Sequence, residues 1–453
     1  MNQHPISNET SHMKLESSNR NGHINPLSNQ SGAMNLESIQ SAERKLLLNT
    51  YARNPILFIS GAGVHLRDEQ GLDYLDFLSG IGVSALGYAH PAVEATIAAQ
   101  SKRLIHTSNL FFHEHTAELA LRLTEISGLD RVFLCNSGTE AWEAALKLAR
   151  AHAGLLRAEG KQIGTRFLAL EHSFHGRTMG SIATTHKAQY REPFAPVMPG
   201  VDFVRFNDVA DLRAKFSADI CGICIEPIQG EGGIHPISQE FFATARELCD
   251  STGALLLADE IQSGLGRTGQ WFAYQHYSIL PDITTVAKPI ANGIPMGAML
   301  CTDQAARAFT PGVHGTTFGG GPLACAVAIT VIDTIKQTGL LAHIAEVGDY
   351  FHSQLDALRV KHECVTAVRG LGLMLGLELD STQLAAQVAS EMLSRRIIIN
   401  RTSDTVLRFL PPFILERSHV DTAIAALDEI ITSLTSTPAL AGAVPAGEKK
   451  HGQ

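Results

Sequence analysis

Four stretches of the chain place polar side chains next to apolar runs, where they could take part in chemistry. In the first, Ser137, Gly138 and Thr139 follow the apolar run 132–135 and begin a helical pattern. Bare backbone amides and the positive end of a helix dipole attract anions, so this turn could bind a phosphate group. An ordinary helix N-cap would explain the same residues without any ligand.

Two further apolar runs end in ionisable residues. Asp259 follows the run 255–258, and a buried carboxylate there would keep a pyridine nitrogen protonated, as pyridoxal needs to act as an electron sink. Lys288 follows the run 283–287, and burial would lower the pKa of its amine, which could then form a Schiff base with an aldehyde and carry protons. Taken singly, the acid could be a helix cap or salt-bridge partner, and the lysine a solvated strand end.

The fourth stretch is the glycine-rich segment 315–322, which contains Thr316 and Thr317 and precedes the apolar helical pattern 323–335. Hydroxyls and flexible glycines before a helix can also bind phosphate. In an open parallel sheet, ligands collect where the carboxyl ends of the strands meet. A phosphate-binding turn, a ring-nitrogen acid and an imine-forming lysine in this order therefore predict a pyridoxal 5'-phosphate site without a metal ion.

A mostly parallel sheet must position these residues. Near-continuous apolar runs separated by helical patterns indicate strands that are buried on both faces, as in an α/β domain. The predicted strands are 132–135, 167–170, 201–206, 220–228, 255–258, 283–287 and 296–301. After Lys336, helices and short strands, among them 373–379 and 406–410, indicate a smaller α+β domain.

We expect two domains with loose ends. The segment 1–35 is rich in Ser, Asn and Gly and is predicted to be a disordered tail. Residues 36–95 are expected to pack with the small domain, 96–335 to form the large cofactor-binding domain, 336–435 to form the small domain, and 436–453 to be a flexible tail.

Composition and charge restrict the class of function. The 453 residues include 45 acidic and 36 basic side chains, a net charge of -9, which disfavours a nucleic-acid partner and favours small-molecule substrates. No run of about 18 apolar residues occurs, so no membrane span is expected. Seven scattered cysteines fit reduced thiols in the cytoplasm better than a disulfide framework.

Three motifs suggest other functions when each is taken alone. The segment 264–269 has the glycine spacing of a dinucleotide-binding turn, with Asp282 where a ribose-binding acid could fall, so an NAD-binding oxidoreductase is the main rival class. Cys221 and Cys224 have redox or zinc spacing, but residues three apart in a strand face opposite sides, which favours buried thiols. The two-histidine segment 113–115 lacks further ligands at metal spacing and indicates a loop or helix start.

Longer motifs connect these stretches. The segments 77–91, 106–110, 173–178 (Ser-Phe-His-Gly-Arg-Thr) and 226–233 (Glu-Pro-Ile-Gln-Gly-Glu-Gly-Gly), together with the strand-end motifs, resemble the class III aminotransferases of fold type I over about residues 50–427. The similarity is strongest to the N-acetylornithine aminotransferases. It implies a large domain with a mostly parallel seven-stranded sheet between helices, a smaller α+β domain and pyridoxal phosphate as cofactor.

By this resemblance, one set of residues binds the cofactor: Gly138, Thr139, Phe174, Asp259, Ile261, Gln262, Lys288 and Thr317. Asp259 and Lys288 are the catalytic pair within it. Phe174 and Ile261 would cover the two faces of the cofactor ring, while Gln262 would bind the ring hydroxyl. Thr317 would reach a phosphate in the neighbouring subunit, which implies a homodimer with shared active sites.

The same resemblance implies a set that binds substrate carboxylates: Arg177, Glu231, Thr316 and Arg408. Planar guanidinium groups suit bidentate binding of carboxylates. Arg408 would pair with Glu231 while the ω-amine donor is bound, and would be released when the 2-oxo acid binds.

The implied reaction is a ping-pong transamination from N-acetylornithine to 2-oxoglutarate, which gives N-acetylglutamate 5-semialdehyde and glutamate, as in arginine biosynthesis. Succinylornithine, an acylated lysine-type amine, ornithine and 4-aminobutyrate are alternative donors, and an aminomutase or a non-catalytic binding protein are further alternatives. Ile81 stands where ornithine aminotransferases resemble one another in having tyrosine, which disfavours free ornithine. Trp142, Gly321 and the segment 289–292 depart from the usual pattern without removing a catalytic group.

Overall fold

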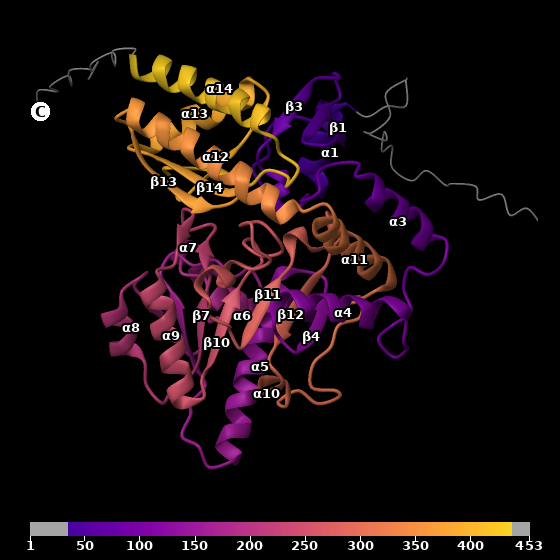
Figure 1. The fold of residues 1–453 in the computed structure, drawn as a ribbon, viewed down its shortest axis with the longest axis vertical. Coiled ribbons are helices and arrows are strands. Elements are labelled where there is room, and N and C mark those ends of the chain that lie inside the picture. Colours follow the sequence, from indigo (N-terminus) through magenta and orange to yellow (C-terminus); the bar gives the residue numbers. More distant parts are fainter. Residues whose placement is uncertain (1–34, 437–453) are drawn as a thin grey trace, which may run out of the picture.

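A seven-stranded sheet forms the centre of the computed structural model, which describes residues 35–436 (Figure 1). Its strands are β4 Arg131–Cys135, β5 Arg166–Leu170, β6 Val201–Val204, β7 Ile220–Ile225, β10 Leu255–Asp259, β11 Ile283–Val286 and β12 Gly297–Cys301. Their order across the sheet is β4-β12-β11-β10-β7-β5-β6. Strand β12 is antiparallel to both neighbours and the other pairs are parallel. The predicted mostly parallel sheet of seven strands is confirmed.

Two predicted strands end earlier than expected, 201–206 at Val204 and 220–228 at Ile225. The apolar run 220–228 forms β7 only as far as Ile225, because Pro227 cannot donate a hydrogen bond to the ladder. The preceding Glu226 turns its carboxylate inward, where it accepts the backbone N–H groups of Phe174 at 2.9 Å and Gly230 at 3.2 Å. The chain then resumes as the short strand β8 Ile228–Gln229, which pairs with β9 His235–Pro236.

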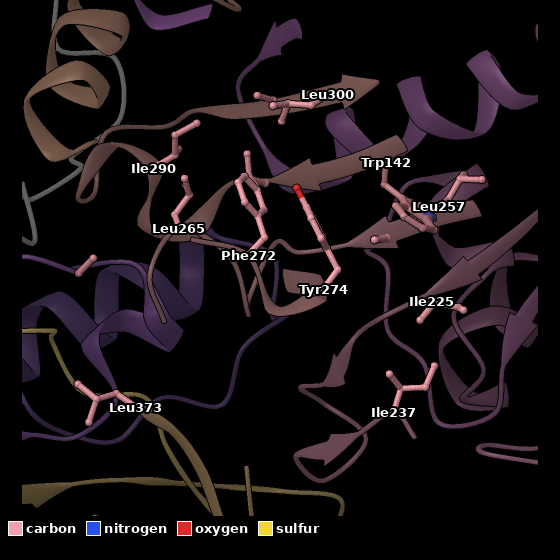
Figure 2. Packing of buried hydrophobic residues seen from close by; sticks show 14 of the residues in the cluster. Trp142, Ile225, Ile237, Leu257, Leu265, Phe272, Tyr274, Ile290, Leu300 and Leu373 are labelled. Carbon is pink, nitrogen blue, oxygen red and sulfur yellow. The ribbon is translucent and has the colours of Figure 1, made fainter. Parts of the chain in front are cut away.

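Helices pack against this sheet directly or through one another. They are α4 Glu114–Ser127, α5 Gly138–Ala158, α8 Val209–Lys215, α9 Gln239–Thr252, α10 Asp303–Ala306 and α11 Pro322–Gln337. Helix α5 lies against five of the strands, β4, β7, β10, β11 and β12. Figure 2 shows buried side chains of one hydrophobic cluster on β7, β10, β12 and α5, which are Ile225, Leu257, Leu300 and Trp142. Helix α5, which begins at the predicted phosphate-binding turn, is therefore packed into the hydrophobic core.

A second, antiparallel sheet lies above the first in Figure 1. It has the order β13-β14-β17-β16, with β13 Val365–Leu371, β14 Met374–Leu379, β16 Asn400–Thr402 and β17 Val406–Phe409. The helices α12 Leu340–Lys361, α13 Thr382–Ser394 and α14 Arg417–Ser436 pack with it. The predicted strands 373–379 and 406–410 correspond to β14 and β17.

The N-terminal segment joins this upper part of the molecule. After α1 Leu36–Leu46, the strands β1 Phe58–Ala62, β2 His65–Asp68 and β3 Asp73–Asp76 form an antiparallel unit. Strand β15 Ile397–Ile398, from the C-terminal part, adds to β3 in parallel. The remaining elements are α2 Ser79–Gly82, α3 Pro91–Ser101, α6 Met179–Ala183, α7 Ala188–Arg191 and the 3-10 turns Glu192–Phe194, Ala273–Tyr277 and Lys288–Ala291. Of the two predicted tails, 1–34 and 437–453 lie outside the described residues.

The three misleading motifs have structural explanations. The segment 264–269 lies in turns, without the helix that a dinucleotide-binding motif requires. Cys221 and Cys224 are buried free thiols in β7, and His113 caps α4 by accepting the N–H of His115. Within residues 35–436, no group of three or more His, Cys, Asp and Glu side chains could hold a metal ion. No single helix in that range is long and apolar enough to cross a membrane, although the bent pair α11 and α12 passes by length and composition alone.

Candidate active site

A cavity of about 200 Å³ lies at the carboxyl ends of β10 and β11, beside the start of α5. It brings together eight of the residues predicted from the sequence: Gly138, Thr139, Phe174, Glu231, Asp259, Ile261, Gln262 and Lys288. They come from segments up to 150 residues apart along the chain. The parallel strands are what make them neighbours, because their carboxyl ends share one edge of the sheet.

The start of α5 presents its backbone amides to this cavity. Ser137 is the N-cap, and its side chain accepts the N–H of Glu140 at 3.3 Å. A Cβ atom on Gly138 would lie 2.8 Å from two carbon atoms of Ile261, so only glycine allows Ile261 to pack so closely over the helix start. The hydroxyl of Thr139 is held by the Ser181 hydroxyl at 2.8 Å. The geometry suits a phosphate group at the positive end of a 21-residue helix.

Asp259 is a buried carboxylate with partners on both oxygens. It ends β10, is 5% exposed, and its Oδ1 accepts the backbone N–H of Ile261 at 3.1 Å. Its Oδ2 lies 2.7 Å from Nδ1 of His175. His175 belongs to a motif visible in the sequence, but its role was missed because its partner is 84 residues away. A buried carboxylate needs such partners to remain charged.

Lys288 begins the turn that follows β11, and its side chain is largely enclosed by the cavity. Burial lowers the pKa of its amine, and the positive charge of Arg408 lowers it further, whereas Glu231, Asp259 and Glu226 act in the opposite direction. No residue of the described chain forms a hydrogen bond or ion pair with this amine. Lys288 therefore supplies a reactive amine inside the cavity.

Glu226 is a second functional candidate that sequence reasoning did not assign. Its carboxyl group lines the cavity and is fully buried among backbone amides. Burial raises its pKa to about 7, against an ordinary value of 4.5. The sequence offered two signals: its place at the end of an apolar run, directly before Pro227, and its position as the first residue of the motif 226–233.

Arg408, on β17 of the second sheet, is not part of the cavity lining but contacts two residues of it, Glu231 and Gln262. It is 1% exposed and forms a short ion pair with Glu231. Its other contacts are Oε1 of Gln262 at 3.3 Å and Oδ1 of Asn400 at 3.1 Å. Burial alone would raise the pKa of Glu231, but the charge and hydrogen bond of Arg408 outweigh it, so that pKa lies below its ordinary value.

The other predicted residues lie outside the cavity lining. The guanidinium of Arg177 lies 3.8 Å from the ring centre of Tyr190 and 5.5 Å from that of Phe174, and it has no ion pair within residues 35–436. The Thr316 hydroxyl accepts a hydrogen bond from Asn136 at 3.1 Å. Thr317 is exposed on the adjoining loop and does not contact the cavity of its own chain.

These features fit pyridoxal phosphate in size and chemistry. The helix start offers amides to a phosphate, Asp259 offers a charge to a ring nitrogen, and Lys288 offers an amine to an aldehyde. Phe174 and Ile261 both line the cavity and offer it apolar surface for a flat ring.

Comparison with known proteins places the chain in a family. The family model described as aminotransferase class III matches residues 49–431. The chain belongs to the class III aminotransferases. The predicted family and enzyme class are thereby confirmed, and the NAD-binding oxidoreductase is set aside.

Relatives of this class III aminotransferase are similar over most of their length. The acetylornithine aminotransferase of Methanocaldococcus jannaschii is 43% identical over 402 residues, covering 88% of this chain and 100% of that protein. Acetylornithine aminotransferase 1 of Bordetella bronchiseptica is 45% identical over 389 residues, with 85% and 97% covered. The ornithine aminotransferase of Toxoplasma gondii has a TM-score of 0.84 at 30% identity, with 88% and 96% covered. The acetylornithine aminotransferase of Elizabethkingia anophelis has a TM-score of 0.78 at 28% identity, with 88% and 100% covered.

The residues that depart from the usual family pattern are accommodated locally in this aminotransferase. Pro289 occupies the first turn after Lys288, a position where its missing N–H costs nothing. Gly321 caps α11, which begins with Pro322. Trp142 is fully buried on α5, with its ring stacked on His175.

Proposed function

We propose that this aminotransferase uses pyridoxal phosphate to transfer the ω-amino group of N-acetylornithine to 2-oxoglutarate. The observation that carries the proposal is the free amine of Lys288 in one cavity with Asp259 and the start of α5. Relatives 40–45% identical over most of the chain are named acetylornithine aminotransferases, which supports the donor and a place in arginine biosynthesis.

When bound, the cofactor supplies an electron sink for the carbon that loses its proton. Lys288 carries the cofactor and moves that proton, since a lowered pKa leaves its amine free to act as a base. Asp259 holds a proton on the ring nitrogen through its negative charge. Phe174 and Ile261 hold the ring from its two faces, and Gln262 binds the ring hydroxyl.

The two arginines divide the work of binding carboxylates. Arg177 binds the carboxylate that both the donor and glutamate carry, because its guanidinium lies 5.5 Å from the ring of Phe174 and has no acidic partner among residues 35–436. Arg408 binds the second carboxylate of 2-oxoglutarate. For the donor, whose reacting carbon lacks a carboxylate, Glu231 neutralises Arg408 and so avoids a buried unpaired charge.

A homodimer completes the site in this proposal. Large apolar side chains lie exposed beside the loop that carries Thr317: Leu104, Ile105, Leu110, Phe111, Phe112 and Phe318. Soluble monomers rarely expose so many apolar side chains along adjoining segments, so a second copy of the chain is the expected cover. Thr316 and Thr317 would then face the phosphate of the partner. The free, mostly buried cysteines support the cytoplasm as the compartment.

Ornithine is the second candidate donor, because four similar solved structures, from two organisms, are ornithine aminotransferases. Ile81 argues against it: an aliphatic side chain cannot donate a hydrogen bond to the polar end of free ornithine. Ile81 has a φ of 66°, which is costly for a β-branched residue, and it lies on the segment whose Gly82 approaches Lys288.

The visible absorbance of the purified holoenzyme tests the proposal. The cofactor band should disappear on addition of N-acetylornithine and return with 2-oxoglutarate. Lys288→Ala should lose this cycling while keeping its fold by circular dichroism. A band that responds only to ornithine or to 4-aminobutyrate would reject the donor, and a protein that binds no pyridoxal phosphate would reject the whole proposal. Dependence on 2-oxoglutarate separates the transferase from an aminomutase.

A further inference from the structure

Trp142 and His175 form a parallel aromatic stack directly behind the cofactor cavity. Their ring centres are 4.2 Å apart and the planes differ by 7°. Trp142 lies one turn after Gly138 on α5, and both rings are almost completely buried. An aromatic stack of this kind restricts how the smaller ring can turn.

The indole is itself held in place. Its Nε1 donates to the hydroxyl of Thr184 at 2.9 Å, and that hydroxyl donates to the carbonyl of Ser181 at 2.9 Å. The backbone carbonyl of Thr184 accepts the hydroxyl of Ser173 at 2.9 Å. The indole ring on which His175 stacks is therefore held by Thr184, which is itself hydrogen-bonded to Ser181 and Ser173.

The position of the proton on His175 follows from its surroundings. Nδ1 lies 2.7 Å from Oδ2 of Asp259, whereas Nε2 is buried and has no hydrogen-bond partner within the described chain. A proton on Nε2 would be a buried donor without an acceptor, which is unfavourable. The favoured tautomer therefore carries its proton on Nδ1 and donates it to Asp259. This hydrogen bond orients Asp259 without cancelling its charge.

The other ionisable groups near this pair are few. Glu226 and Cys224 interact with it from β7 and the residues that follow. Glu260, the next residue in the chain, and Lys288, from across the cavity, interact with Asp259. Glu226 is engaged with two backbone amides, so it is not turned toward Nε2.

We propose that Trp142 is a positioning residue that clamps His175 in its neutral, Nδ1-protonated form, so that Asp259 presents an undiminished negative charge to the cofactor's ring nitrogen. The inference rests on the proposed role of Asp259. It assigns a function to a side chain that departs from the usual family pattern, and it makes the affinity for the cofactor depend on a ring that never touches it.

Tryptophan emission tests the protonation state. The chain contains two tryptophans, so Trp271→Phe leaves Trp142 as the only emitter and serves as the parent for all variants. A charged imidazolium stacked on an indole quenches its emission. At neutral pH, this holoenzyme should therefore emit as strongly as a variant that also carries His175→Gln, because the glutamine amide cannot take up a charge. Stronger emission from that variant, at the same circular dichroism and cofactor content, would overturn the inference.

Cofactor affinity tests the clamp. In the same background, Trp142→Leu should raise the dissociation constant of pyridoxal phosphate about tenfold, whereas Trp142→Phe, which keeps a flat ring, should raise it much less. Thr184→Val removes the anchor outside the cavity and should raise it about threefold, as expected for one buried hydrogen bond. Thr184→Val also decides the matter if Trp142→Leu does not fold.

Asp259→Asn separates this inference from the proposed function. If it abolishes the cofactor cycle while the Trp142 and Thr184 variants bind the cofactor like their parent, the clamp is rejected and the role of Asp259 stands. If Asp259→Asn leaves both binding and cycling intact, the role of Asp259 falls and the clamp falls with it.

Discussion

Arg408 and Glu231 are 177 residues apart in the chain and form an ion pair. Arg408 lies on β17 of the second sheet, and Glu231 lies in the turn between β8 and β9. Arg408 is nearly inaccessible to solvent, whereas Glu231 is half-buried at the cavity and thus better able to move. This asymmetry suits a pair in which the acid withdraws and the arginine stays in place to receive a carboxylate.

Glu231→Gln is expected to separate the two half-reactions. Without its acid, Arg408 faces the donor as an unpaired buried charge, so the KM for N-acetylornithine should rise at least about tenfold. The KM for 2-oxoglutarate should stay the same or fall, because its carboxylate supplies the missing partner. Stopped-flow measurement of each half-reaction checks this, with Glu346→Gln, which breaks the exposed pair with Arg417, as the control. Equal losses in both half-reactions would contradict the switch.

Gly138→Ala tests the close packing at the start of α5. The added methyl group would meet Ile261 at 2.8 Å and push it toward the cofactor ring, so the dissociation constant for pyridoxal phosphate should rise at least about tenfold. Gly154→Ala is the matched control on the same helix, because its methyl group meets only Arg157 at 3.8 Å. That change should stabilise the fold by about 0.5–1 kcal/mol. If both variants have the dissociation constant of the parent, the close packing of Ile261 on Gly138 does not control cofactor binding.

Phe112→Glu tests the proposed dimer. Phe112 is fully exposed to solvent in the single chain, and Leu110 beside it is 85% exposed. A charge at a buried apolar interface is unfavourable, so sedimentation should show the variant at half the parent mass with weakened cofactor binding. Val360→Glu, at a 77% exposed site on α12, should leave the mass unchanged. A parent protein that already sediments as a monomer would refute the shared site.

Glu260→Gln tests a buried acid outside the cavity. Burial raises the pKa of Glu260 from 4.5 to about 7, although hydrogen bonds from Ser263 and from the N–H of Tyr274 oppose the shift. Between these values the folded protein holds a proton that the unfolded chain has released, so this residue's contribution to stability falls as pH rises. The free energy of unfolding in urea, taken as variant minus parent, should therefore be larger at pH 8 than at pH 5.5. Glu226, which has a similar pKa, is present in both proteins and cancels from the difference. A difference that is the same at both pH values would show that Glu260 is charged throughout.

The amino-acid sequence determined the strands of the large sheet and the chemical groups at their ends. An apolar run such as 255–258 followed by Asp259 carries its own signal, since a strand buried on both faces needs apolar side chains at every position. The same holds for 283–287 and Lys288. The limit of that signal was the run 220–228, where one proline ended the strand early.

The tertiary structure alone decided which of these groups meet. Four features have no local signature in the sequence. They are the antiparallel direction of β12, the pairing of His175 with Asp259, the ion pair of Arg408 with Glu231, and the stack of Trp142 on His175. Each joins residues far apart in the chain, and their distance is set by how sheets and helices pack rather than by neighbouring residues. Burial then decided the chemistry, because the lowered pKa of Lys288 depends on a desolvation that only the folded chain provides, and the orientation of Asp259 depends on its contact with His175.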